Sequence, residues 1–149
     1  MPFVHPGRRM AGGGALTEFD DELPVLQASG IGAVVSLLNI PSDTSVYESA
    51  GFRFLCLPVP DGGAPTMDQA AEFLRFVEEQ HTARRAVAVH CEAGLGRTGT
   101  LLAVYLIAHG AAAAEAVQRV RSVESVAIET PRQVEFLHQY AETFRSRKG

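Results

Sequence analysis

Up to residue 90, short apolar runs alternate with amphipathic segments. The runs at 33–38, 52–59 and 86–90 are rich in valine and leucine, and they predict buried β-strands. Between the last two runs, apolar residues recur at the i, i+3, i+4, i+7 spacing of a helix, with Thr66 at its N-cap and Gln69 three residues later. Strands separated by helices predict an α/β sandwich, with a mainly parallel sheet of about four to five strands and helices on both faces.

The remainder of the chain has a helical pattern. Residues 97–109 are apolar on most sides, so they predict a buried central helix that Gly110 is placed to end. A further helix is expected over 112–123. Thr130, followed by a proline and then Gln133, fits the N-cap and N3 positions of a last helix that runs to about residue 144.

Length, composition and charge limit the class of protein and the kinds of molecule that it could bind. The 149 residues suit one domain over 1–149, and we expect a monomer, with a flexible stretch at Gly12–Gly14. Thirteen Lys and Arg against 17 Asp and Glu give a net charge of −4, which lacks the basic footprint usual for nucleic-acid binding. No apolar run approaches the roughly 20 residues that span a bilayer, and no secretory leader pattern opens the chain. Two cysteines, Cys56 and Cys91, do not make a disulfide framework, so we expect a cytoplasmic protein.

The loop after the third predicted strand carries the strongest chemical signal. It runs from Cys91 to Arg97 and Thr98, with glycines at 94, 96 and 99. These glycines allow a tight turn in which successive backbone N–H groups point inward, and the following helix N-terminus adds positive potential. Arg97 supplies a planar fork that holds two oxygens of a phosphate. This field favours the thiolate of Cys91, which can attack the phosphorus of a bound phosphomonoester.

Other interpretations of this loop fit less well. A Walker loop needs a lysine before the Ser or Thr that opens the helix, and none occurs here. A zinc site lacks a second nearby cysteine, and adjacent residues His90 and Cys91 point to opposite faces of a strand. We therefore expect no metal and no other cofactor. A lone cysteine in a glycine-rich turn is often only buried, but the combined spacing of Cys91, Arg97 and Thr98 favours function.

The segment His90-Cys91-x-x-Gly94-x-x-Arg97-Thr98-Gly99 resembles the signature loop of the cysteine-dependent protein phosphatases. With its length, strand–helix order and helical tail, the chain from about Pro6 to Phe144 is similar to the small atypical dual-specificity phosphatases of the VHZ type. The resemblance implies a three-layer sandwich like that of the protein tyrosine phosphatases. It also implies that Cys91 forms a phosphocysteine and that Thr98 stabilises the thiolate when it leaves. The residues that would bind phosphate are Glu92, Ala93, Gly94, Leu95, Gly96 and Arg97.

His90, just before the nucleophile, has two interpretations. The resemblance implies that it supports the geometry of the loop through hydrogen bonds. It is equally a histidine satisfied within the core, and both interpretations can hold together.

An acid is needed to protonate the leaving oxygen, and Asp61 is the best candidate. No aspartate follows Cys91, which argues against the low-molecular-weight phosphatases, whose acid follows the signature loop. Asp61 follows a buried strand, and the carboxyl ends of parallel strands meet at one edge of a sheet. An Asp-Gly pair is also a common turn, but the resemblance favours Asp61 because the family's mobile acid loop occupies this place. Asp68 is expected in the first turn of the next helix, where its role is structural.

The start of the last helix offers two accessory candidates, Glu129 and Gln133. The resemblance implies that polar residues here approach the active site and orient the hydrolytic water. Gln133 is equally a capping-box partner of Thr130, so its role stays open. Arg132 is expected to be solvated. Cys56 is expected to be a buried strand thiol without a disulfide to the nucleophile.

The expected function is hydrolysis of phosphomonoesters on phosphorylated proteins or peptides. A chain this short predicts a shallow site that accepts phosphotyrosine and also phosphoserine or phosphothreonine. We also expect a phosphatase of this kind to be inhibited by phosphate-like oxyanions such as vanadate. Glu92 in the loop argues against phosphoinositides. Two alternatives are a phosphopeptide-binding module, which typically loses the cysteine or the acid, and a rhodanese-like thiol transferase, which does not need Asp61 or Thr98.

Overall fold

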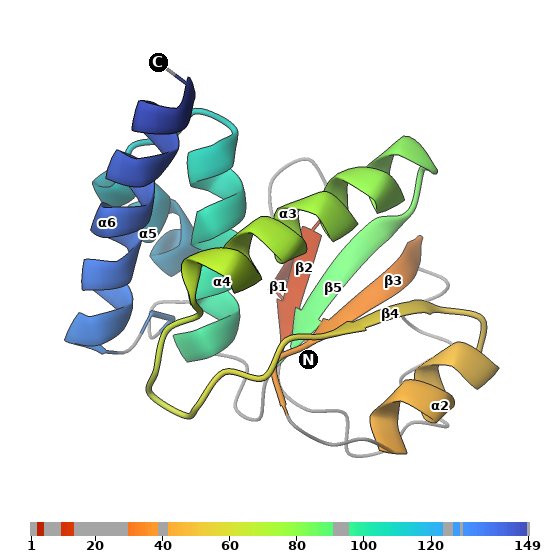
Figure 1. Ribbon diagram of the computed structural model, residues 1–149. Coiled ribbons are helices and arrows are strands. Elements are labelled where there is room, and N and C mark those ends of the chain that lie inside the picture. Colours follow the sequence, from red (N-terminus) through yellow and green to blue (C-terminus); the bar gives the residue numbers. More distant parts are fainter. Residues whose placement is uncertain are drawn as a thin grey trace.

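The computed structural model describes residues 3–4, 10–13, 30–38, 42–90, 96–123, 127–128 and 130–148. In this part of the chain, five strands form one sheet in the order β1-β2-β5-β3-β4 (Figure 1). Their bounds are Phe3–Val4 for β1, Met10–Gly13 for β2, Ile31–Ser36 for β3, Arg53–Cys56 for β4 and Ala86–His90 for β5. Strand β1 is antiparallel to β2, and the other four strands are parallel to one another.

Five helices surround the sheet in the described residues. They are α2 (Ser42–Ser49), α3 (Met67–Thr82), α4 (Gly96–Ala108), α5 (Ala113–Val123) and α6 (Pro131–Lys148). Figure 1 shows α3 crossing in front of the sheet, α4 to α6 gathered on one side, and α2 beyond β4. The N-termini of α4 and α6 lie at the same end of the helical group as the loop that follows β4.

Alternation along the strands divides the core into two parts. On β3, Val35 faces a large core that includes Phe73 of α3, Leu101 of α4 and Leu137 of α6. The neighbouring residue Val34 faces the opposite way, into a smaller core under α2 that includes Tyr47, Phe52 and Ala88. Helices therefore cover both faces of a mainly parallel sheet, as the alternation of strands and helices predicted.

Strands β1 and β2, which lie on the far side of β5 from β3, were not predicted. The stretch at Gly12–Gly14 was interpreted as flexible, but Gly12 and Gly13 belong to β2 and pair with Val89 and His90 of β5. The sequence Met-Ala-Gly-Gly has no β-branched residue and gives no strand signal of its own. Its strand state depends on the ladder with β5, which no local pattern encodes.

The second predicted strand is shorter than expected. Strand β4 ends at Cys56 rather than continuing to Val59, because the prolines at 58 and 60 have no N–H to donate to a ladder. The backbone still follows β3 for three more residues: the Leu57 N–H donates to Ser36 O at 2.8 Å, and the Val59 N–H donates to Leu37 O at 3.0 Å. These bonds carry the chain past the end of the strand toward the edge of the sheet where β5 also ends.

The helix N-termini match the sequence expectations closely, whereas the last helix, α6, runs to Lys148 rather than to about residue 144. Thr66 accepts a hydrogen bond from the Gln69 N–H, and the Gln69 side chain accepts from the Thr66 N–H, which completes the expected capping box of α3. Helix α6 begins at Pro131, directly after Thr130, as predicted. Helix α2 had not been expected, because Ser-Asp-Thr-Ser-Val-Tyr-Glu-Ser has too few apolar residues to show a helical period.

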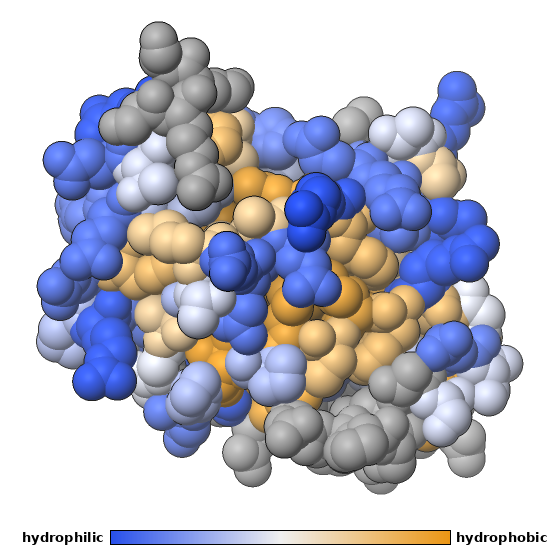
Figure 2. Space-filling model, in the orientation of Figure 1, coloured by the Kyte–Doolittle hydropathy of each residue, from blue (hydrophilic) through white to orange (hydrophobic). Residues whose placement is uncertain are grey.

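The face drawn in Figure 2 has a mixed surface. Hydrophobic residues gather in the middle of this face, and hydrophilic residues surround and interrupt them. Among the described residues, Val123 on α5 is the one large hydrophobic side chain that is substantially exposed. No helix in the described part of the chain combines the length and the apolar composition needed to cross a membrane.

Candidate active site

Two segments meet at the carboxyl edge of the sheet: the loop after β4, and the connection from β5 to α4. The middle of that connection, from Cys91 through Glu92, Ala93 and Gly94 to Leu95, lies outside the described residues, so the roles predicted for it stay predictions. Its two ends are described. His90 closes β5, and Gly96 and Arg97 open α4, which gives the strand–loop–helix order that the sequence predicted.

Arg97 is a buried cation that joins these two segments. Its Nη1 donates a hydrogen bond to Val59 O at 2.9 Å, and its Nη2 lies 3.8 Å from Asp61 Oδ1. A buried charge is costly unless it is paired, so the loop after β4 supplies the partners that this guanidinium needs. The structure thus brings together the predicted phosphate-binding arginine and the predicted acid, which are far apart in the sequence.

Asp61 sits on an exposed turn. The Gly63 N–H donates to Pro60 O at 2.8 Å and closes the turn, and Gly62 has a φ of +74°, which glycine adopts without steric cost. The Asp61 side chain is 90% exposed, so its ion pair with Arg97 adds little stability. Asp61 can therefore be both a turn residue and the candidate acid, because the Asp-Gly turn presents its carboxylate beside Arg97.

Thr98 and Gly99 occupy the first turn of α4. Thr98 is fully buried, directly after Arg97, and its predicted effect on the Cys91 thiolate remains a prediction. Gly99 does not belong to the tight turn to which the sequence assigned it. A Cβ atom at Gly99 would lie 2.9 Å from the Ala127 Cβ and 3.2 Å from the Ile128 N. The glycine is needed because a distant segment packs directly against the helix backbone.

Replacing Gly99 by alanine is expected to destabilise the fold by about 1–3 kcal/mol, because an overpacked contact must be relieved by moving backbone. The free energy of unfolding from denaturant titration measures this change. The double variant Gly99→Ala/Ala127→Gly removes the nearest clashing atom and should recover part of the loss. If Gly99→Ala unfolds at the same denaturant concentration as the parent protein, the close approach is not what requires glycine.

The segment against Gly99 is held in a strained conformation. Ile128 is buried and has a φ of +60°, a left-handed backbone that is costly for a β-branched residue. Arg121 of α5 donates from Nε to Ala127 O at 3.0 Å and from Nη2 to Ile128 O. These bonds fix the segment immediately before Glu129. Glu129 itself lies outside the described residues.

His90 contacts a residue that the sequence did not single out. Its Nε2 lies 3.2 Å from the Tyr47 Oη, and both residues are buried. Tyr47 stacks on Phe54 with a ring separation of 5.0 Å and meets Phe52 edge-on at 6.1 Å. His90 is therefore anchored through Nε2 in the small core under α2, and this contact accounts for one of its two ring nitrogens. Its support of the signature loop remains a prediction.

Thr130 and Gln133 form the expected capping box. The Gln133 N–H donates to Thr130 Oγ1 at 3.2 Å, and the Thr130 N–H donates to Gln133 Oε1 at 3.1 Å. The same side chains also reach the turn that carries Asp61: Thr130 Oγ1 donates to Gly62 O at 2.9 Å, and Gln133 Nε2 donates to Gly63 O at 3.0 Å. The sequence gave no signal for these two bonds, because they join residues about 70 positions apart.

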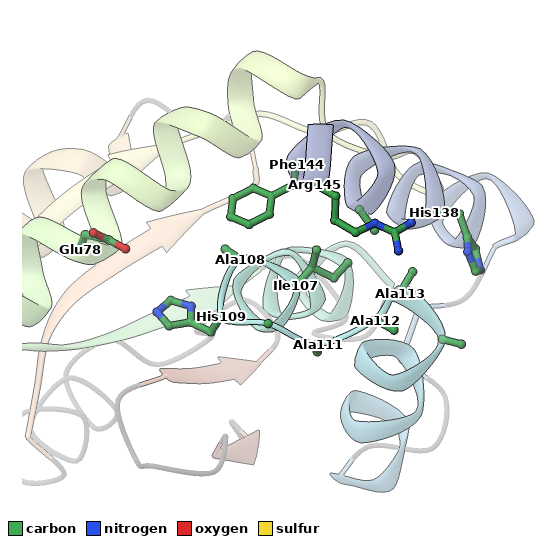
Figure 3. A pocket seen from close by; sticks show the side chains of 13 residues that line it. Glu78, Ile107, Ala108, His109, Ala111, Ala112, Ala113, His138, Phe144 and Arg145 are labelled. Atoms are coloured by element: carbon green, nitrogen blue, oxygen red, sulfur yellow. The ribbon is translucent and has the colours of Figure 1, made fainter. Parts of the chain in front are cut away.

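Other described features lie away from this edge. Cys56 is half-buried and donates from Sγ to Leu38 O at 3.1 Å, in line with a strand thiol. A cavity of about 1030 Å³ lies at the opposite end of α4, lined among others by His109, His138, Phe144 and Arg145 (Figure 3). That end is about 18 Å along the helix from Arg97, so the cavity is separate from the site. No group of histidine, cysteine, aspartate or glutamate side chains suited to a metal ion occurs among the described residues.

Comparisons with known proteins agree with this fold. A family model described as "Polymorphic toxin system, DSP-PTPase phosphatase" matches residues 10–111. Dual specificity protein phosphatase CDC14B of Mus musculus is 34% identical over 105 residues, which are 70% of this chain and 19% of that protein. Probable protein tyrosine phosphatase type IVA B of Dictyostelium discoideum is 34% identical over 111 residues, which are 72% of this chain and 66% of that protein.

A solved structure of a related phosphatase has the same fold. The crystal structure of Tk-PTP in the active form superposes with a TM-score of 0.80 at 32% identity, over 90% of this chain and 92% of that one. The fold is thus that of the cysteine-dependent protein tyrosine phosphatases. Within this superfamily, the chain belongs to the dual-specificity protein phosphatases, a family of hydrolases. It spans about a fifth of the length of the CDC14 relatives.

Proposed function

We propose that this protein hydrolyses phosphomonoesters on phosphorylated proteins through a phosphocysteine intermediate on Cys91. The observation that carries the proposal is the meeting of Asp61 Oδ1 and Arg97 Nη2 at 3.8 Å, at the edge of the sheet where β5 leads to Cys91. A proton donor beside a phosphate-binding fork is what cleavage of a phosphate ester requires. The family to which the chain belongs supports the same chemistry.

The first step transfers the phosphoryl group to the cysteine. The Cys91 thiolate attacks phosphorus, so that an S–P bond forms as the ester P–O bond breaks. Arg97 and the backbone N–H groups at the start of α4 stabilise the equatorial oxygens, and protonated Asp61 donates its proton to the leaving oxygen. The alcohol or phenol of the substrate leaves.

The second step releases phosphate. Water attacks the phosphocysteine, and the Asp61 carboxylate accepts a proton from that water. The S–P bond breaks, and Thr98, buried in α4 directly after Arg97, stabilises the thiolate that leaves. Inorganic phosphate is released, and both Cys91 and Asp61 return to their starting protonation states. Arg97 and the helix N-terminus supply the positive charge that these steps need.

The exposure of Asp61 supports the proposed substrate class. Asp61 is 90% exposed on a short turn, which favours a shallow site accepting phosphotyrosine as well as phosphoserine or phosphothreonine. The net charge of −4 and Glu92 in the loop disfavour nucleic acids and phosphoinositides. A phosphopeptide-binding module without turnover would not need both Cys91 and Asp61, and a rhodanese-like thiol transferase would not need the Asp61–Arg97 contact.

An Asp61→Asn variant tests the proposed acid, because asparagine keeps the size of the side chain and removes the acidic proton. We expect kcat/KM for a phosphotyrosine peptide to fall about 10²-fold. The loss on p-nitrophenyl phosphate should be much smaller, because that leaving group needs little protonation.

Asp68→Asn is the matched control, since Asp68 is an exposed aspartate in the first turn of α3. It should leave both rates within about twofold. Equal losses on the two substrates in Asp61→Asn, or no loss on either, would remove Asp61 as the acid.

A further inference from the structure

The turn that carries Asp61 is held by side chains from three other parts of the chain. We name residues 58–63 the acid loop. Four of its backbone carbonyls accept hydrogen bonds from outside it: Pro58 O from Gln69 Nε2 at 2.8 Å, Val59 O from Arg97 Nη1 at 2.9 Å, Gly62 O from Thr130 Oγ1 at 2.9 Å, and Gly63 O from Gln133 Nε2 at 3.0 Å.

Two of these donors come from the first turn of α6 and act on the residues that directly follow Asp61. Thr130 uses its hydroxyl twice, as an acceptor from the Gln133 N–H and as a donor to Gly62 O. Gln133 uses both ends of its amide, Oε1 for the Thr130 N–H and Nε2 for Gly63 O. The capping box of α6 is therefore joined directly to the acid loop.

Burial makes these bonds hard to replace. Gln133 is fully buried, and Gly63 is buried as well. If Gln133 lost its donor, Gly63 O would be left without a partner and without easy access to water, which costs more than the loss of an exposed bond. The side chain of Asp61, in contrast, is 90% exposed. The direction of its carboxyl group is therefore set by the backbone of the turn rather than by packing around the side chain.

The start of α3 provides an internal comparison. Gln69 is also the N3 residue of a capping box, and its Nε2 also donates to a carbonyl of the acid loop, Pro58 O. This bond is exposed to solvent. Its acceptor, Pro58 O, is separated along the chain from Asp61 by Val59, whose carbonyl Arg97 already holds. Gln69 and Gln133 thus share chemistry and helix position but differ in burial and in their distance along the chain from Asp61.

We propose that Thr130 and Gln133 are positioning residues that fix the acid loop so that the Asp61 carboxyl reaches the leaving oxygen. This inference rests on the proposed function, in which Asp61 is the acid. It gives Gln133 a role through Asp61, because its amide bridges Thr130 and Gly63 and so fixes the backbone that follows Asp61. A small displacement of a proton donor is sufficient to slow catalysis substantially.

A Gln133→Glu variant separates capping from positioning. Glutamate keeps an acceptor for the Thr130 N–H but places an oxygen, instead of an N–H donor, against Gly63 O. We expect kcat/KM to fall about tenfold on a phosphotyrosine peptide and less than about threefold on p-nitrophenyl phosphate. In an Asp61→Asn background, the same substitution should cause no further loss on the peptide, because the group that it positions is already absent. Gln69→Glu, the matched control, should stay within about twofold on both substrates.

A second pair of variants avoids placing a charge in the core. Thr130→Val keeps the side-chain shape but removes both the donor to Gly62 O and the acceptor for the Gln133 N–H, and its loss should again be larger on the peptide than on p-nitrophenyl phosphate. Thr130→Ser keeps the hydroxyl and should restore peptide turnover to within about threefold of the parent protein. Thermal unfolding of each variant checks that the fold is retained.

The outcomes separate this inference from the proposed function. Asp61→Asn is expected to lower kcat/KM more on the phosphotyrosine peptide than on p-nitrophenyl phosphate. If it does so but Gln133→Glu and Thr130→Val lower kcat/KM equally on the two substrates, Thr130 and Gln133 are structural and the inference is overturned. The same holds if their effect persists in the Asp61→Asn background. If Asp61→Asn itself shows no such difference between the two substrates, the proposed acid fails, and the positioning role fails with it.

Discussion

A Cys91→Ser variant is expected to lose turnover by at least about 10⁴-fold on both p-nitrophenyl phosphate and a phosphotyrosine peptide. A serine hydroxyl is a much weaker nucleophile than a thiolate, and the proposed site has no base assigned to activate it. Phosphate binding should persist, because Arg97 and the N-terminus of α4 are unchanged. Steady-state turnover and the affinity for a phosphotyrosine peptide measure the two quantities separately.

The second cysteine of the chain provides the control. Cys56 is half-buried and donates from Sγ to Leu38 O, a bond that serine can also make. Cys56→Ser should therefore retain turnover to within about twofold. Turnover by Cys91→Ser at the rate of the parent protein would remove Cys91 as the nucleophile.

An Arg97→Lys variant is expected to lower kcat/KM about 10³-fold although the charge is kept. A lysine ammonium carries its three donors on one tetrahedral nitrogen, so it lacks the planar fork with which the guanidinium holds two oxygens of a phosphate while it also donates to Val59 O. The substitution should weaken inhibition by tungstate, an oxyanion that binds without turnover, and should release the Val59 end of the acid loop.

Arg132 is the matched control for Arg97, because it is an exposed arginine in the first turn of α6. Arg132→Lys should change neither kcat/KM nor inhibition by tungstate more than about twofold. If Arg97→Lys keeps both the rate and the oxyanion affinity of the parent protein, the guanidinium geometry is not what the site requires.

The parts of the fold that could be predicted are those with a local pattern. Strands β3 and β5 are apolar runs, the apolar period and capping box of α3 stand out in the sequence, and so does the largely apolar stretch that forms α4. The meeting of Asp61 and Arg97 was predicted from a general property of parallel sheets, whose strands end at one edge. The structure then adds the distance between them and the bond from Arg97 to Val59 O.

The parts that could not be predicted depend on contacts between distant segments. Strand β2 forms because β5 supplies a ladder, not because its own residues favour a strand. Tyr47 reaches His90 from α2, a helix with little apolar period. Gly99 was assigned to a turn because a glycine carries no local sign of what packs against it, here Ala127 and Ile128.

Gln133 shows how one residue can satisfy a local and a distant requirement at once. Its spacing from Thr130 predicted the capping box correctly, and that interpretation alone would have closed the question of its role. The second bond, to Gly63 O, is visible only once α6 and the acid loop are placed side by side. A sequence position that is fully explained by one local rule can therefore still carry a second function.

The most direct test of the account is to identify the atom that carries phosphate during turnover. The Asp61→Asn variant is mixed with p-nitrophenyl phosphate and quenched within the first turnover. The protein is then digested with a protease, and the masses of its peptides are measured by mass spectrometry. Because this leaving group needs little protonation but hydrolysis of the intermediate still needs the carboxylate, we expect a stoichiometric burst of p-nitrophenol and one phosphate on Cys91. A burst with phosphate on any other residue, or steady release of p-nitrophenol with Cys91 never phosphorylated, would contradict the account.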